Sequence, residues 1–484
     1  MTGAVAHDVA IVGYGPVGAV LANLLGRAGL DVVVFEPALD VYHLPRAAHF
    51  DDEVMRVFQG IGLAEAVLPS TTPVLGMDFV TARGEVLFGF SSADRSRHHG
   101  WEAGYMFHQP RLERALRAGV ARFSNVEVHL GHEVVALDVT DRDVVALRVQ
   151  HIESRTEEQV RARFVVGCDG ARSFVRRALG IGLDDTGFDQ PWLVVDAVLR
   201  DDATCTLPDR VLQICDPARP ATFVPSVDRH RRWELMSMGE TAEELLEPQT
   251  IARLIAPWAT VGRDIEIERA AVYSFHALVA KEWRRGRVLL AGDAAHQMPP
   301  FLGQGMCSGI RDATNLAWKI EMILDDRAGA ALLDTYQPER EPHVRAITDM
   351  AVALGGILQT TDSAVAAARD EGFRSGSNGT PPETPPLALG RGLCHGSAPA
   401  VGRPFPQPRP GDDDMLGTGW AAVGPLADLS GIEALGGRSV VRPGNATAIV
   451  RPDRYTFAEC DDEPSLSEAM TALVTALHQP TLSG

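Results

Sequence analysis

The sequence predicts an α/β protein that begins with a parallel sheet and is interrupted by an antiparallel one. Near the N-terminus two short apolar runs, Val9–Val12 and Val32–Phe35, flank an apolar helical pattern over 17–28. A strand, a helix and a second strand within about 30 residues form a βαβ unit, whose strands are parallel. Between about 190 and 275 the pattern changes to longer strands of antiparallel type, which predicts an inserted sheet.

The remaining elements follow in chain order. β-branched and apolar runs predict further strands at 126–130, 134–139, 144–149, 164–166, 192–199, 210–214, 233–238 and 288–291. The last of these returns the chain to the parallel sheet, and a helix is expected over 305–324.

These patterns divide the chain into a discontinuous domain and two smaller parts. Residues 1–185 and 270–360 are expected to form the parallel-sheet domain, and residues 186–269 the inserted sheet domain. A stretch rich in Pro, Gly, Ser and Thr at 375–389 predicts a linker, which we place at 361–390. Residues 391–484 mix weak helical and strand patterns and predict a small C-terminal αβ region.

Composition excludes several classes of function. The 484 residues include 45 Lys and Arg against 64 Asp and Glu, a net charge of −19, which disfavours binding to nucleic acid or to an anionic membrane surface. The six cysteines show no metal-ligand spacing, and we expect no metal site. No apolar run approaches the ~18 residues of a membrane span, and the first residues lack the basic and apolar segments of a signal peptide, which disfavours secretion. We therefore expect a cytoplasmic protein. We also expect a monomer or a homodimer, between which the sequence does not decide.

A glycine-rich loop follows the first predicted strand. Residues 13–18 read GYGPVG, a GxGxxG pattern between a strand and a helix. The first glycine permits a tight turn, the second lets the backbone approach a pyrophosphate, and the third allows close helix packing. Glu36 ends the second strand, where a carboxylate can accept the hydroxyl groups of an adenosine ribose. The loop predicts a Rossmann-like dinucleotide site without separating NAD from FAD.

Two further motifs place an aspartate directly after a buried strand. Residues 167–173 read GCDGARS, with Asp169, and residues 292–296 read GDAAH, with Asp293. Ligands of open α/β sheets bind at the carboxyl ends of the strands. A single Asp-Gly is most often a turn. Two such motifs together with the glycine loop are hard to explain as turns.

The three motifs resemble the signatures of the class A flavoprotein aromatic hydroxylases, the para-hydroxybenzoate hydroxylase type. The 3-(3-hydroxyphenyl)propionate hydroxylase branch is most similar, in Pro45-Arg46-Ala47, in Ile61-Gly62-Leu63 and above all in residues 286–319. The resemblance covers about residues 8–350. It implies an FAD-binding domain of the glutathione-reductase type, a substrate-binding sheet domain and, at the C-terminus, a shortened thioredoxin-like domain.

The resemblance also implies which residues bind FAD. Glu36 would bind the adenosine ribose, Asp293 a ribityl hydroxyl, and Asp169 both FAD and the nicotinamide nucleotide. Gln109 would contact the FAD chain, and Arg46 would lie near the pyrophosphate and the flavin. The remaining cofactor-binding residues belong to the glycine loop or precede the 305–324 helix: Gly13, Gly15, Pro16, Val17, Gly18, Pro300, Gly303, Gln304, Gly305 and Met306.

The family chemistry implies hydride transfer from NADH or NADPH to FAD, addition of O2 at flavin C4a as a hydroperoxide, and transfer of OH to a phenolic ring. Pro300 would form a rigid wall beside the flavin. Deprotonation of the phenol requires a base. Arg46, His49 and Tyr273 are the catalytic candidates, while His108, His276 and His296 are considered as bases and His296 is more often structural in such a motif.

The substrate pocket is expected on the inserted sheet. We place Gln213, Pro225, Trp233 and Leu235 on its faces, although apolar residues at strand spacing are more often core. The expected substrate is a phenolic acid like 3-(3-hydroxyphenyl)propionate, whose carboxylate would meet an arginine among 219, 229, 231 and 232. The alternatives are a larger polyketide-type aromatic or a flavin-binding redox sensor without turnover.

Overall fold

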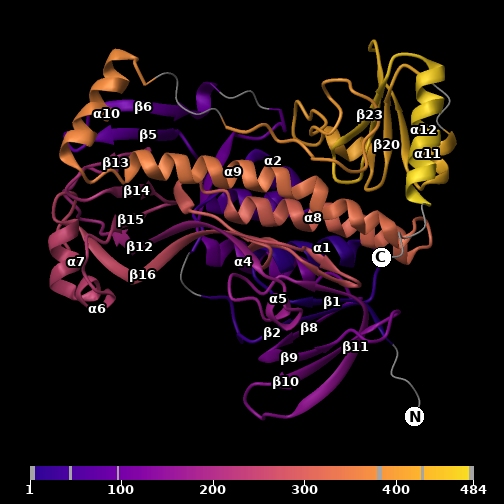
Figure 1. Ribbon diagram of the computed structural model, residues 1–484, viewed down its shortest axis with the longest axis horizontal. Coiled ribbons are helices and arrows are strands. Elements are labelled where there is room, and N and C mark those ends of the chain that lie inside the picture. Colours follow the sequence, from indigo (N-terminus) through magenta and orange to yellow (C-terminus); the bar gives the residue numbers. More distant parts are fainter. Residues whose placement is uncertain (1–5, 43–45, 95–97, 379–383, 427–429, 479–484) are drawn as a thin grey trace.

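The computed structural model describes residues 6–42, 46–94, 98–378, 384–426 and 430–478. Pro45 of the motif above lies outside these ranges, as do residues 379–383 of the expected linker. The strands of the described residues form four sheets, with helices between and around them (Figure 1). The predicted α/β class is confirmed.

The first sheet contains the predicted βαβ unit. Val9–Val12 of β1 pair in parallel with Val32–Phe35 of β2, and the helix α1 (Pro16–Arg27) connects them. The strand order is β17-β18-β11-β1-β2-β8, with β10 and β9 extending from β11. Their bounds are β1 His7–Val12, β2 Val32–Glu36, β8 Val126–Leu130, β9 His132–Asp138, β10 Val145–His151, β11 Glu157–Gly167, β17 Arg284–Arg285 and β18 Val288–Leu290. The ends of β1, β11 and β18 therefore meet at one edge of the sheet.

The second sheet is broader than residues 186–269. Its order is β19-β16-β12-β15-β14-β13-β5-β6, and all pairs are antiparallel except β13 with β5. Strands β5 and β6 come from far upstream in the chain, a non-local pairing that no local pattern indicates. The bounds are β5 Gly76–Thr81, β6 Val86–Ser91, β12 Leu183–Leu199, β13 Val211–Cys215, β14 Ala221–Pro225, β15 His230–Met236, β16 Ile265–Ala280 and β19 His296–Gln297.

One face of this second sheet is closed by two short helices. Trp233 and Leu235 pack there against Leu245 of α6 (Ala242–Leu246) and Ile251 of α7 (Pro248–Ile255) in a buried apolar cluster. Since side chains alternate across a strand, the residues between them face the opposite way. That opposite face looks toward the first sheet.

Two long helices run side by side across the middle of the molecule, α8 (Gly305–Leu324) and α9 (Tyr336–Leu358) (Figure 1). The α8 bounds agree with the predicted helix over 305–324. A third, small sheet has the order β3-β7-β4. The remaining elements here are β3 His49–Asp51, β4 Thr71–Pro73, β7 Gly104–Phe107, α2 Asp52–Gly60, α3 Ala64–Val67, α4 Gln109–Val120 and α5 Phe174–Ala178, with short 3-10 turns at Leu68–Ser70, Ser92–Asp94, Gly292–Ala294, Pro300–Leu302, Ala330–Thr335 and Asp412–Leu416.

The expected linker needs correction, because its first part is helical. The helix α10 (Ser363–Ser375) begins at Asp362, whose side chain accepts hydrogen bonds from two backbone N–H groups of its first turn. The C-terminal region holds a fourth sheet of order β21-β20-β22-β23 beside α12 (Glu463–Leu477), at the end of α8 (Figure 1). Its further bounds are β20 Ala421–Gly424, β21 Arg438–Val441, β22 Thr447–Val450, β23 Thr456–Cys460 and α11 Ser430–Ala434. The thioredoxin-like assignment of this region stays a prediction.

Candidate active site

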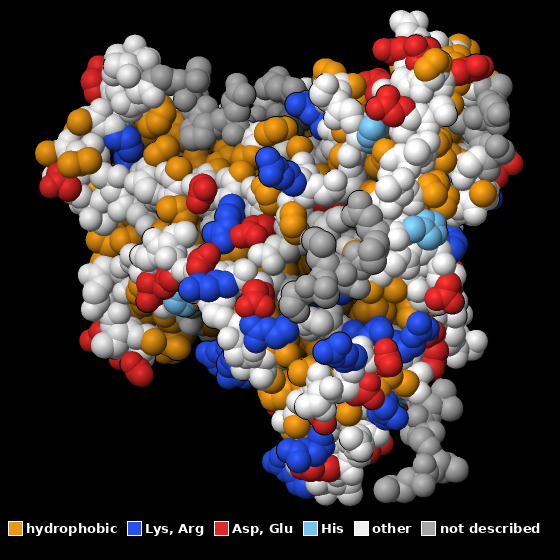
Figure 2. All heavy atoms as spheres, turned by 45° about the vertical axis from the view of Figure 1, so that its right-hand side comes forward, with side chains coloured by type: hydrophobic (Ala, Val, Ile, Leu, Met, Phe, Trp, Pro, Cys, Tyr) orange, Lys and Arg blue, Asp and Glu red, His pale blue; other side chains and the backbone are white. Residues whose placement is uncertain are grey.

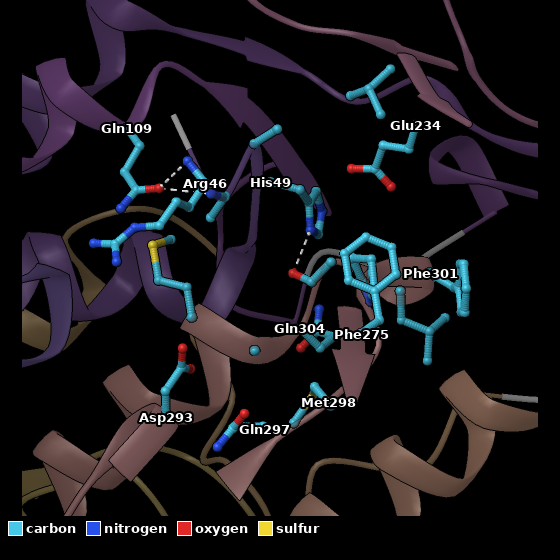
Figure 3. A pocket seen from close by; sticks show the side chains of 18 of the residues that line it. Arg46, His49, Gln109, Glu234, Phe275, Asp293, Gln297, Met298, Phe301 and Gln304 are labelled. Atoms are coloured by element: carbon cyan, nitrogen blue, oxygen red, sulfur yellow. Dashed lines mark hydrogen bonds between the residues drawn. The ribbon is translucent and has the colours of Figure 1, made fainter. Parts of the chain in front are cut away.

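A cavity of about 1300 Å³ lies where the carboxyl ends of the parallel strands face the second sheet. The loops after β1, β11 and β18 contribute Gly15, Asp169 and Asp293 to its lining. The second sheet contributes its other wall, and Figure 3 shows side chains from both parts directed into it. The three sequence motifs therefore converge on one cavity.

The glycine loop has the geometry that a phosphate site needs. Gly13 has φ +100°, and a Cβ there would lie 2.5 Å from the carbonyl oxygen of Cys168. A Cβ on Gly18 would lie 2.1 Å from the oxygen of Gly13. A Cβ on Gly15, in contrast, would meet no atom of the described residues within 4 Å. The loop is thus tight on the protein side and open on the cavity side, in front of the unpaired N–H groups at the start of α1.

Both motif aspartates line the cavity and have acceptor capacity. Asp169 accepts the backbone N–H of Val175 with one oxygen, and within the described residues its other oxygen is buried without a hydrogen-bond partner. The Asp293 side chain is open to the cavity but surrounded by protein on its other sides, and burial raises the pKa of its carboxyl group. Hydroxyl groups of a sugar chain fit such acceptors. This donor and acceptor set therefore fits FAD.

Gln109 holds the segment that carries Arg46. Its side-chain oxygen accepts the backbone N–H groups of Arg46 and Ala47 at 2.8 and 2.7 Å, and its amide donates to Glu113 at 2.6 Å (Figure 3). Gln109 and Arg46 both line the cavity. Gln109 thus positions the backbone at Arg46, in addition to any contact with the cofactor.

The start of α8 forms the floor of the cavity. Gly303, Gln304, Gly305 and Met306 line it, next to Pro300 and the buried Phe301. His49 also lines it, and its Nδ1 lies 3.4 Å from the carbonyl oxygen of Gly303 (Figure 3). An anion at this floor would face the N–H groups of the first turn of α8. Cys307, in the first turn of α8, is fully buried and belongs to the core.

Some predicted cofactor residues lie behind the cavity wall rather than in it. Glu36 is outside the lining, and its carboxylate accepts the N–H groups of Tyr14 at 2.8 Å and Ala38 at 3.0 Å. Gly13 and Gly18 shape the loop from behind, whereas Pro16 and Val17 reach the lining.

The second sheet presents a different set of residues from the one expected. Gln213 lines the cavity, but Trp233 and Leu235 lie on the opposite face in the core with α6 and α7, and Pro225 is outside the lining. The expectation is corrected accordingly, because the alternation along β15 sends Arg232 and Glu234 to the cavity instead. Arg219, Arg229 and Arg231 do not line the cavity either.

A buried cluster of charged residues occupies this wall. Arg232 donates from Nε to Asp196 at 2.7 Å, and Arg269 lies 3.5 Å from the other oxygen of Asp196. Burial, together with the charge of Asp196, raises the pKa of Glu234 to about 7 in spite of Arg232 nearby. Tyr273 lines the cavity beneath the Arg269 guanidinium, 4.9 Å from its ring centre. The feature of the sequence that points to this charged wall is the alternation of charged residues with Trp233 and Leu235.

Of the remaining histidine candidates, one lines the cavity and two do not. His296 is buried and lies 2.6 Å from Asp312, which also accepts from Arg340, so the structural interpretation of His296 is supported. His108 is outside the lining, and burial beside His230 lowers its pKa to about 4. His276 lines the cavity near its rim, opposite Asp189 on β12.

A buried network beneath the floor connects it with the C-terminal region. Arg311 of α8 donates to Asp51, to Glu53 and, at 3.2 Å, to the side-chain oxygen of Gln304. The hydroxyl group of Tyr455 donates to Glu53 at 2.7 Å. The charge of Arg311 outweighs the burial of Asp51 and lowers the pKa of that carboxyl group to about 2. A residue near the end of the chain thus supports the floor of the cavity.

A second buried network lies further along the same helix. Arg451 donates to Glu339 of α9 at 2.8 Å, and Lys319 of α8 donates to the same carboxylate oxygen at 2.8 Å. All three side chains are fully buried.

Residues 6–351 match a family model described as an FAD binding domain. The chain belongs to this FAD-binding family. A protein of Rhodococcus jostii (strain RHA1) named probable NADH-specific resorcinol 4-hydroxylase is 40% identical over an alignment that covers 98% of this chain and 95% of that protein.

A second relative is longer than this chain. The 3-(3-hydroxy-phenyl)propionate/3-hydroxycinnamic acid hydroxylase of Escherichia coli (strain K12) is 40% identical over 352 residues, 72% of this chain and 62% of that protein. The expected family, enzyme class and cofactor are confirmed: the chain is an FAD-dependent aromatic-ring monooxygenase.

Solved structures share the fold at lower identity. A complex of aklavinone-11 hydroxylase with FAD and aklavinone has a TM-score of 0.83 at 24% identity and covers 98% of this chain and 99% of that one. The p-nitrophenol 4-monooxygenase PnpA of Pseudomonas putida DLL-E4 has a TM-score of 0.70 at 24% identity and covers 77% of this chain and 94% of that one.

The charge distribution on the surface and the character of the helices are relevant to the expectation that the protein binds neither nucleic acid nor membranes. On the face shown in Figure 2, basic and acidic side chains are interspersed. Among the described helices, none has the length and apolar character needed to cross a membrane.

Proposed function

We propose that the protein is an NADH-dependent hydroxylase of a small, uncharged phenol of the resorcinol type. FAD would take the hydride of NADH and react with O2, so that one oxygen atom enters the ring and the other leaves as water. The match to the resorcinol hydroxylase relative favours this assignment, because it covers 98% of this chain.

The observation that carries the substrate class is the charge of the second-sheet wall. Arg232 and Arg269 are both engaged by Asp196, and Glu234 lies 3.9 Å from Arg232. A substrate carboxylate at this wall would meet two acidic side chains and compete for arginines already paired. A phenolic hydroxyl group, in contrast, can donate to a carboxylate.

The protein residues bind, orient and enclose the reactants. The loops at Gly15, Asp169 and Asp293 would hold FAD, with the isoalloxazine against Pro300 and the start of α8. Phe275 and Phe301, whose ring centres are 6.2 Å apart in an edge-on arrangement, would hold the substrate ring and exclude water. We also propose that the second sheet is the substrate-binding domain inserted in the FAD-binding domain, which is of the glutathione-reductase type.

A phenolic acid of the 3-(3-hydroxyphenyl)propionate kind is the second candidate. Arg46 favours it, since its exposed side chain lines the cavity on the side opposite Glu234 and could meet a carboxylate (Figure 3). The E. coli relative carries a name of this substrate class.

The test measures NADH and NADPH oxidation in air by the FAD-loaded protein, with product and H2O2 quantified separately. We expect resorcinol to stimulate oxidation of NADH and to yield the trihydroxybenzene, with little H2O2. The dimethyl ether of resorcinol is the matched control, because it has the same ring without an ionisable hydroxyl group. Product from the phenolic acid and none from resorcinol would replace the first candidate by the second, and turnover of larger phenols alone would exclude both.

A further inference from the structure

Glu234 is the buried carboxyl group that the second sheet presents to the cavity. It lies on β15, with only 7% of its surface exposed, and lines the cavity between strands that contribute Val194 and Thr222. In Figure 3 its carboxylate projects into the cavity on the side where Phe275 and Phe301 lie. A ring held by those two aromatic residues would therefore have this carboxylate at its edge.

The groups around Glu234 come from several strands. Arg232 on the same strand lies 3.9 Å away, Asp196 on β12 pairs with Arg232, and Arg269 on β16 pairs with Asp196. On the other side, Thr222 of β14 donates to the side-chain oxygen of Gln213 on β13 at 2.6 Å. Neither of these side chains carries a charge. The charges that act on the Glu234 carboxylate are therefore the cation Arg232 and the anion Asp196.

This environment matches the requirement for a base that works near neutral pH. Burial and Asp196 together raise the pKa of Glu234 to about 7, and a general base is most effective when its pKa lies close to the working pH. Two of the histidine candidates are less suitable. His296 is held by Asp312, and His108 lies outside the cavity.

We propose that Glu234 accepts the proton of the substrate's phenolic hydroxyl group, while Arg232 stabilises the resulting phenolate. The proposal rests on the function proposed above. The O–H bond breaks, the proton moves to a carboxylate oxygen of Glu234, and the electron pair stays on the phenolate, which makes the ring more nucleophilic. After one oxygen atom of O2 has entered the ring and the other has left as water, with two electrons supplied by NADH, the C–H bond at the hydroxylated carbon breaks. Its electron pair restores the aromatic ring, and its proton goes to solvent water. Glu234 then returns its proton to the phenolate oxygen.

The experiment compares the FAD-loaded wild type with Glu234→Gln across pH, measuring NADH oxidation, product and H2O2. For the wild type we expect the rate of product formation to rise with pH through about 7. For Glu234→Gln we expect a loss of about 100-fold at neutral pH, within the range of general-base contributions. The variant's rate should recover as pH approaches the pKa of the free phenol, while its substrate-stimulated NADH oxidation persists and yields H2O2. Ring-fluorinated resorcinols, whose hydroxyl groups are more acidic, should restore product formation at lower pH.

A matched control and a wild-type measurement keep the test decisive. Glu240→Gln makes the same chemical change in the loop after β15, where Glu240 pairs with Arg219 outside the cavity, and should keep the wild-type pH profile. If Glu234→Gln does not fold, the wild-type profile is measured with phenols of differing acidity, and its midpoint should stay near 7. A midpoint that follows the acidity of the phenol, or a Glu234→Gln profile that keeps the wild-type shape, would overturn the proposal. Failure of every phenol to react with the wild type would instead refute the proposed function.

Discussion

Because the pKa of Glu234 is raised, ionisation of this buried residue lowers the free energy of unfolding at alkaline pH. Replacing Glu234 by a neutral residue should therefore make the protein more stable there. An ordinary glutamate ionises near 4.5, whereas Glu234 in the folded protein ionises near 7. Between these values the folded protein holds a proton that the unfolded chain has lost, so the free energy of unfolding falls as pH rises. Above pH 7 the full difference of about 2.5 pKa units corresponds to about 3 kcal/mol. Glu234→Gln removes this cost, because the amide stays neutral.

The assay is thermal unfolding of the FAD-loaded protein at about pH 4.5 and about pH 8. An unfolding entropy of ~2.1 cal/mol/K per residue over 484 residues converts 3 kcal/mol into a rise in Tm of about 3 °C for Glu234→Gln at the higher pH, and little change at the lower one. Glu240→Gln should have the opposite sign at pH 8, because the Arg219 partner and the Met238 N–H lower the pKa of Glu240 to about 2 against the effect of burial. An equal shift of the Glu234→Gln variant at both pH values would refute the reasoning.

Further predictions concern the cofactor, the core and the floor of the cavity. Asp293→Ala should weaken FAD binding by about 10- to 150-fold, since a charge-assisted hydrogen bond contributes about 1.5–3 kcal/mol; full flavin occupancy after dialysis would contradict this. Trp233→Ala should lower the free energy of unfolding by about 3–5 kcal/mol in chemical denaturation without changing KM, and a changed KM would place this side chain in the site after all. Tyr455→Phe should reduce flavin retention and raise the H2O2 fraction through the loss of its bond to Glu53. The matched hydroxyl deletion Tyr336→Phe, whose hydroxyl group donates to the carbonyl oxygen of Leu290, should leave the H2O2 fraction unchanged, and equal effects of the two would argue against the floor network.

The cofactor half of the cavity could be predicted because its signals are local. Each motif is a strand, a short loop and a helix or turn within a few residues, and the edge at which parallel strands end brings the loops together. Gly15, Asp169 and Asp293 therefore appear in one cavity, although they are far apart in the chain.

The substrate half was less predictable, because hydrophobicity indicates which residues are buried but not against what. Trp233 and Leu235 are buried as expected, yet in the core beneath the sheet, and choosing the wrong face of a strand reverses every assignment on it. In the sequence, the charges of Glu234 and Arg232 predict positions on the surface. Their burial depends on partners from other strands, such as Asp196, which no local pattern reveals.

The two buried networks beneath α8 and α9 also impose an order in time on the making of the protein. Glu53 and Glu339 are synthesised long before Tyr455 and Arg451, which complete their sets of hydrogen-bond partners. At ~5–20 residues per second, the 402 residues between Glu53 and Tyr455 take roughly 20–80 s to translate. During that interval Glu53 can pair with Arg311 and Glu339 with Lys319, but the C-terminal partners of both carboxylates are missing. The contact that Tyr455 makes beneath the floor of the cavity can therefore form only after residue 455 has left the ribosome.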